Sequence, residues 1–174
     1  SREEVVDELR KRLEELNKEV REVVRESERK AERALEEVEE MVKRVREELE
    51  KLKRDIKGDE MRREVDEIVR KVEEDLERVI REVKKLIDDL RRHSEDVERR
   101  SKESVDRLKE VLERDIQNKD DLRRLLKEVA ERNRKLLEDD EELAERVLRE
   151  VRRLLEELRR RLKEIKERLD EIRR

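Results

Sequence analysis

Aliphatic residues recur through the chain at the period of an α-helix, and this regularity restricts the possible folds more than any other feature. Positions i and i + 18 are equivalent, as the adjacent pairs Val5-Val6, Val23-Val24 and Met41-Val42 illustrate. Each such repeat contains five core positions, which corresponds to about 3.6 residues per step, the natural helical period. A shorter spacing would impose a left-handed supercoil and a longer one a right-handed supercoil. The pattern therefore predicts long helices that run nearly straight.

Two short interruptions divide this pattern into three helical segments. The first is centred on Gly58, the single glycine of the chain, and the second on Asn118. We expect both residues to take the left-handed conformation that ends a helix, and Asp59 and Asp120 to cap the helices that follow. The expected helices cover residues 2–57, 60–116 and 120–174.

The fold class that follows is all-α. Ser1 and Glu4 have the spacing of a capping box for the first helix. Short loops between long helices make sequential helices antiparallel neighbours. We therefore predict one domain over residues 1–174, a long antiparallel up-down-up three-helix bundle with 18-residue layering. Left- and right-handed placements of the third helix satisfy the same pattern.

Composition excludes several classes of protein. Charged residues make up 62% of the chain, which on composition alone is typical of disorder, but the helical periodicity favours a folded core. The 52 basic and 56 acidic residues are interleaved, so no basic stripe for nucleic acid emerges. Without cysteine there are no disulfides, and no apolar run is long enough to span a membrane. We expect a monomer with cytoplasmic localisation, no targeting signal and no required partner.

The chain resembles parametrically designed, untwisted three-helix bundles. The resemblance covers all three helices and rests on the identical 18-residue layering, the aliphatic core, the Glu, Arg and Lys surface and the minimal loops. Natural spectrin-type repeats are similar in topology but are shorter and have aromatic core residues, which this chain lacks. Resemblance to designed bundles implies a hyperstable scaffold without an inherited substrate, cofactor or catalytic activity.

The spacing also assigns the individual core positions. The seam includes Val23, Ile68, Leu86, Ser104 and Leu136. If the helices form hairpins, residue i of the first helix should lie level with about residue 117 − i of the second and i + 119 of the third. Ser27, for example, is expected level with Leu90 and Arg146.

Several of these core positions are polar although the equivalent positions one repeat away are aliphatic. Asp140, for example, is equivalent to Leu122 and Leu158, and Ser94 to Leu76 and Leu112. Together with two flanking residues, the polar positions occupy about 20 Å along the expected bundle, at about 1.5 Å per residue. The predicted polar set is Asn17, Ser27, His93, Ser94, Ser101, Ser104, Asn133 and Asp140.

Three interpretations of this polar stretch compete. The first is a buried hydrogen-bond network that fixes the register of the helices, because unsatisfied buried polar groups are destabilising. The second is a small-molecule site, or a hydrolytic site with a serine nucleophile, His93 as base and Asp140 to orient it. The third is a switch by phosphorylation of Ser94, because Arg91-Arg92-His93-Ser94 resembles the acceptor motif of basophilic kinases.

His93 is the single histidine, so a metal site would have to take its remaining ligands from carboxylates. We therefore expect no metal and no cofactor. Pairing of His93 with Asp140 would favour the protonated imidazole in the folded state and give mild pH sensitivity near neutral pH. Taken together, the sequence favours a scaffold that is not an enzyme, with the first interpretation of its polar stretch.

Overall fold

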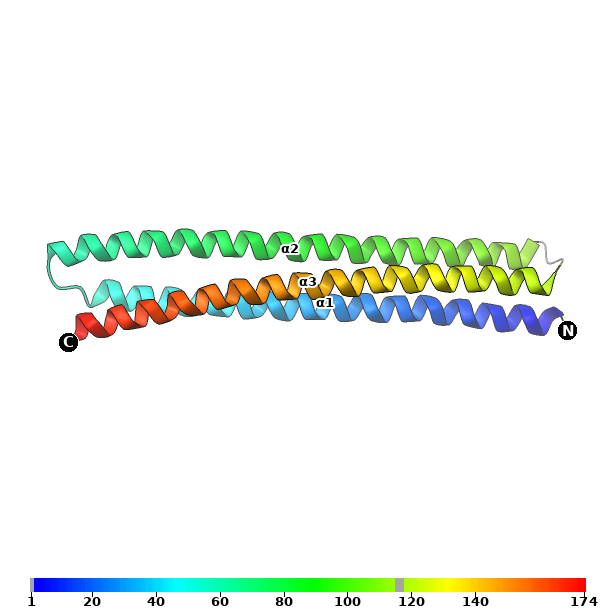
Figure 1. Cartoon of the computed structure of the whole chain (residues 1–174), viewed down its shortest axis with the longest axis horizontal. Helices are drawn as coiled ribbons and strands as arrows, with labels where there is room; N and C mark the ends of the chain where they lie inside the picture. The colour runs from blue at the N-terminus through cyan, green and yellow to red at the C-terminus, as the bar shows by residue number, and fades with distance from the viewer. Residues whose placement is uncertain (1, 115–117) are drawn as a thin grey trace. The chain divides into compact units, whose positions relative to one another are not determined.

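The computed structural model describes residues 2–114 and 118–174, and it confirms the all-α three-helix bundle. Helix α1 spans Arg2–Arg54, α2 spans Asp59–Arg114 and α3 spans Lys119–Arg173 (Figure 1). No strand occurs in the described residues. None of the described helices contains a stretch long and apolar enough to cross a membrane.

The chain forms two compact units, and each contains a segment of every helix. Unit 1 contains the residues up to Lys30 together with Asp89–Glu145. Unit 2 contains Ala31–Asp88 and Arg146–Arg174. The polar positions predicted from the sequence all belong to unit 1.

The core of unit 1 shows that sequential helices are antiparallel. One apolar cluster joins Leu13 of α1, Leu108 of α2 and Leu126 of α3. A second joins Val20 and Val24 of α1 with Val97 of α2 and Leu137 of α3. Residue numbers therefore rise along α1 and α3 in the direction in which they fall along α2. This is the predicted up-down-up order.

Unit 2 has an aliphatic interior and ion pairs between its helix segments. Leu49, Leu76 and Leu154 are fully buried. Arg46 of α1 pairs with Glu73 of α2 at 3.5 Å, and Arg161 of α3 pairs with Asp75 of α2 at 2.8 Å. Because these charged groups are partly exposed, each pair contributes at most about 1 kcal/mol. The stability of unit 2 therefore rests on the aliphatic interior.

At five points the buried residue lies one position after the one assigned from the sequence. Ser104 and the four aliphatic residues assigned with it are half-buried, while the residues that follow them are buried. The period of a pattern fixes the spacing of core positions but not the rotation of the helix about its axis. Adjacent residues, about 100° apart, therefore compete for the interior. The buried residues are Val24, Val69, Ile87, Val105 and Leu137.

The first connection differs from the prediction in its capping. Helix α1 ends at Arg54, before the expected end at residue 57. Gly58 has the expected positive φ, 105°, but it directly precedes α2, and its carbonyl accepts the Arg62 N–H at 3.1 Å. The prediction that Asp59 caps α2 was therefore wrong, because Gly58 holds the capping position and Asp59 lies in the first helical turn.

The second connection shows a similar shift at the start of α3. The side-chain Oδ1 of Asn118 accepts the Asp120 N–H at 3.0 Å, and its carbonyl accepts the Leu122 N–H at 3.3 Å. Asn118 is thus the N-cap, and it has no positive φ. The predictions that Asn118 is left-handed and that Asp120 is the cap were wrong. The expected capping role of Ser1 and the expected end of the second helix at residue 116 lie outside the described residues.

Candidate functional site

The candidate site is centred on Asp140, a fully buried carboxylate on the α3 segment of unit 1. Its Oδ2 accepts the Ser27 hydroxyl of α1 at 3.0 Å, and its Oδ1 accepts the Ser94 hydroxyl of α2 at 2.8 Å. The His93 ring, also on α2, approaches Oδ1 through Nδ1 at 3.1 Å. One acidic side chain therefore binds donors from both other helices. We call these four residues, Ser27, His93, Ser94 and Asp140, the Asp140 cluster.

These contacts explain how a carboxylate can occupy a position whose equivalents are leucines. An ionised carboxylate has about four lone-pair sites and only accepts hydrogen bonds. Burying it without partners would be strongly destabilising, but hydrogen bonds to a charged group stabilise by about 1.5–3 kcal/mol each. The two serine hydroxyls and the approaching His93 ring therefore offset much of the desolvation of Asp140.

The two serines and the histidine differ in their exposure. Ser94 is completely buried and Ser27 nearly so, whereas 34% of the His93 side chain is exposed. The imidazole is thus the member of the cluster that solvent can reach.

The order of the hydrogen bonds differs from that of a serine hydrolase. In such an enzyme the histidine lies between the serine and the acid, so that it can remove the proton from the hydroxyl. Here Ser27 and Ser94 both donate directly to Asp140, and neither bonds to His93 within the described residues. A carboxylate that already accepts both hydroxyls orients them but does not raise their nucleophilicity through an imidazole.

The structure divides the predicted polar set into three groups. Ser27, His93, Ser94 and Asp140 are brought together as the Asp140 cluster. Ser101 and Asn133 are as deeply buried, but the Ser101 hydroxyl and both amide atoms of Asn133 have no hydrogen-bond partner among the described residues. Asn17 and Ser104 are half-buried. They make no hydrogen bond to the cluster in the part of the chain that the structure describes.

The register of the helices also differs from the expected one. Ser27 shares Asp140 with Ser94, whereas the sequence placed it level with Leu90 and Arg146. The expected register treated the first connection as helical up to residue 57. Residues 55–58 are not helical. Each of them can therefore advance along the bundle axis by more than the roughly 1.5 Å that a helical residue does. A shift of a few residues between α1 and its neighbours is the result.

The burial of Ser94 bears on the kinase motif identified in the sequence. The hydroxyl lies inside unit 1, is 0% exposed and donates to a carboxylate. A kinase binds its acceptor in an extended conformation, and here the serine lies within the continuous helix α2. Phosphorylation would therefore require local unfolding of α2.

One charged residue near the cluster, Asp96, was not identified from the sequence. Asp96 follows His93 by one helical turn, and a hydrogen bond from Arg99 holds the pKa of its carboxyl below the ordinary value, although partial burial opposes this shift. The positive charges of Arg100, Arg99 and His93 lower the pKa further. The i, i+3 and i, i+4 spacing could have indicated these ion pairs, but many similar pairs along the chain made this one inconspicuous.

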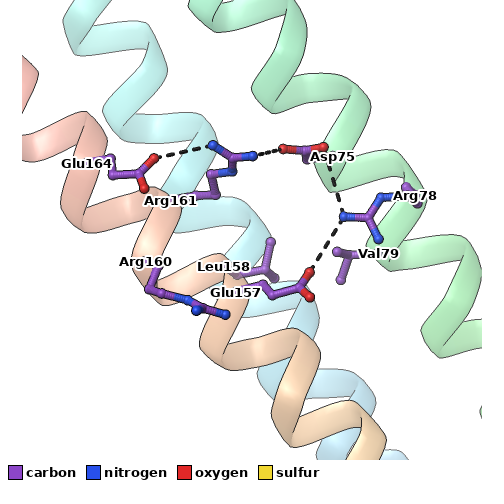
Figure 2. A pocket seen from close by; sticks show the side chains of 8 residues that line it. All are labelled: Asp75, Arg78, Val79, Glu157, Leu158, Arg160, Arg161 and Glu164. Atoms are coloured by element: carbon purple, nitrogen blue, oxygen red, sulfur yellow. Dashed lines mark hydrogen bonds and ion pairs between the residues drawn. The ribbon is translucent and has the colours of Figure 1, made fainter.

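Unit 2 contains a surface groove in which charged side chains form ion pairs with one another. The groove between α2 and α3 has a volume of about 420 Å³. Figure 2 shows Arg161 between Asp75 and Glu164, and Arg78 between Asp75 and Glu157. Arg78 and Arg161 are therefore paired within the groove, whereas Arg160, which also lines it, makes no ion pair among the described residues.

The described residues contain no group of three His, Cys, Asp or Glu side chains positioned to hold a metal ion. Comparisons with families of known proteins, with curated proteins and with solved structures found no match.

Proposed function

We propose that this chain is a designed structural scaffold without catalytic activity, in which the Asp140 cluster sets the register of the three helices. The 18-residue layering and the restricted alphabet support the design origin, because natural helical domains use more varied core residues. The single observation that carries the structural role is that one buried carboxylate accepts hydroxyls from both other helices.

A uniform aliphatic core specifies register weakly, because shifting a helix by one layer exchanges one leucine or valine for another. A buried polar group removes this degeneracy, since every alternative register would leave Asp140, Ser27 or Ser94 without a partner. Each such unsatisfied group is destabilising by about 1–3 kcal/mol, and more when it is charged. The cluster therefore favours the native register of the helices in unit 1 over the shifted registers by several kcal/mol.

The proposal is tested by replacing the polar residues with the aliphatic residues of equivalent layers, as S27V/S94L/D140L. Because the chain has no cysteine, spin labels can be attached to cysteines introduced at exposed Glu22 of α1 and Lys135 of α3. Pulsed electron spin resonance then gives the distance distribution between the two labels within unit 1. We expect one narrow distribution for the parent chain and a broader or multiple one for the aliphatic variant. An equally narrow distribution at the same distance in both would refute the register role.

The scaffold is further proposed to be a monomer that needs no partner. Val111 is the one large hydrophobic residue that is exposed among the described residues, at 40%. Isolated exposed aliphatic residues are common on monomers and do not form an interface. Light scattering should give a mass near 21.6 kDa, and a dimer mass would contradict the proposal.

A further inference from the structure

Ser101 and Asn133 lie in one layer of unit 1, between the two apolar clusters of its core. On α2, Ser101 lies between Val105 of the first cluster and Val97 of the second. On α3, Asn133 lies in the same way between Val129 and Leu137. The intervening layer is therefore built from a hydroxyl and a carboxamide, where the equivalent positions one repeat away are Val83 and Val151.

The polar atoms of this layer have no partner among the described residues. Ser101 and Asn133 are each 1% exposed, and the unbonded atoms are the serine Oγ and the amide Nδ2 and Oδ1. Buried polar atoms are nearly always hydrogen-bonded, to protein or to a bound molecule, because leaving them unpaired is destabilising. Three such atoms in one layer indicate a binding site for a molecule with both donor and acceptor groups.

A groove on the surface of unit 1 leads to this layer. It lies between α1 and α2, has a volume of about 200 Å³ and includes Ser101, but not Asn133, in its lining. Its wall includes Val20, which can contact a small apolar group, and the amide of Asn17. Three charged side chains complete the lining, and all three are exposed: Arg21, Glu98 and Lys102.

We propose that this groove and the layer behind it bind one compact neutral molecule that both donates and accepts hydrogen bonds, either water or a primary carboxamide. A neutral ligand is favoured because the buried groups are uncharged, so an ion would be desolvated without a buried counter-charge. An amide pairs with the amide of Asn133 through one donated and one accepted hydrogen bond, and the Ser101 hydroxyl can serve either role. The site is distinct from the Asp140 cluster, to which neither residue is hydrogen-bonded.

Nuclear magnetic resonance of the full chain, labelled with a nitrogen isotope, distinguishes water from a carboxamide in the site. Bound water is detected by Overhauser effects between long-lived water and the Asn133 side-chain amide. Acetamide is then added while the same amide signals are followed. Acetate, which is charged, and N,N-dimethylacetamide, which has no N–H donor, are the comparison probes. Because acetamide has so few non-hydrogen atoms, its Kd can be no tighter than about tens of micromolar, so the titration extends into the millimolar range. We expect water contacts that disappear as acetamide produces a saturable shift, or water contacts alone if water outcompetes the amide.

Two variants provide the controls. S101V/N133V replaces the site with the aliphatic residues of equivalent layers, should fold at least as stably as the parent, and should lose the saturable response and the bound water. S104A changes a half-buried serine of the same helix that does not line the groove, and should leave both unchanged. The proposal is overturned if the parent chain shows neither bound water nor a saturable acetamide response. It is also overturned if acetate produces the same shift, or if S101V/N133V responds like the parent.

Discussion

Replacing Ser94 by alanine tests the energetics of the Asp140 cluster with little change in volume. The Ser94 hydroxyl is fully buried and donates to Asp140 at 2.8 Å. Losing a hydrogen bond to a charged acceptor is destabilising by about 1.5–3 kcal/mol. The higher helix propensity of alanine offsets about 0.5 kcal/mol of this loss. We therefore expect S94A to reduce the free energy of unfolding by roughly 1–2.5 kcal/mol.

Ser104 of α2 provides the matched control for this substitution. It is half-buried and is not hydrogen-bonded to Asp140, so S104A should gain only the propensity term, up to about 0.5 kcal/mol. Guanidinium titration followed by circular dichroism measures both variants against the parent chain. The two substitutions should change the stability in opposite directions. If S94A is as stable as S104A, the hydroxyl contributes nothing to the cluster and the reasoning is refuted.

Three further predictions concern other parts of the chain. In a denaturant titration, G58A should be less stable than the parent by about 1–2 kcal/mol. Gly58 has a φ of +105°, and an added Cβ would meet no atom within 4 Å, so the loss would come from backbone strain alone. An unchanged midpoint would contradict this backbone conformation. D96N should be less stable than the parent at neutral pH but equally stable in acid. The pKa of Asp96 is lowered in the folded chain, so its contribution is complete above the unfolded pKa of about 4 and disappears as the pH falls through the folded value; a difference that persists in acid would argue against the ion pairs. The folded parent chain should resist phosphorylation of Ser94 by a basophilic kinase, with S94A, which lacks the acceptor hydroxyl, as the background control; rapid incorporation of phosphate at Ser94 in the native chain would show that α2 opens locally.

Much of the fold could be predicted from the sequence because the helical period is so regular. The number of helices, their antiparallel order and most buried positions follow from the spacing of aliphatic residues. The rotation of each helix does not follow, which is why Val105 rather than Ser104 is buried. The capping residues were also misplaced by one position at Gly58 and by two at Asn118, because the first free N–H groups of a helix can donate to an acceptor on either of two nearby residues.

The candidate site was predicted in its composition but not in its connections. Comparing positions i and i + 18 identified Asp140, Ser27 and Ser94 as polar residues in an aliphatic seam. That comparison could not separate them from Ser101 and Asn133, since the partners of a buried group depend on side-chain reach and on the register set by the first loop. The predicted single network is therefore an Asp140 cluster and a separate Ser101–Asn133 layer. The expected pH sensitivity through His93 and the straightness of the helices stay predictions.

The most direct test of the structural role is an experimental structure of the unmodified chain that resolves the Asp140 carboxylate. The Asp140 cluster predicts Ser27 Oγ near 3.0 Å from one carboxylate oxygen and Ser94 Oγ near 2.8 Å from the other. Such a structure would show one buried acceptor that joins all three helices of unit 1. An Asp140 side chain turned to solvent, or bonded to only one of the two serines, would contradict the proposed role.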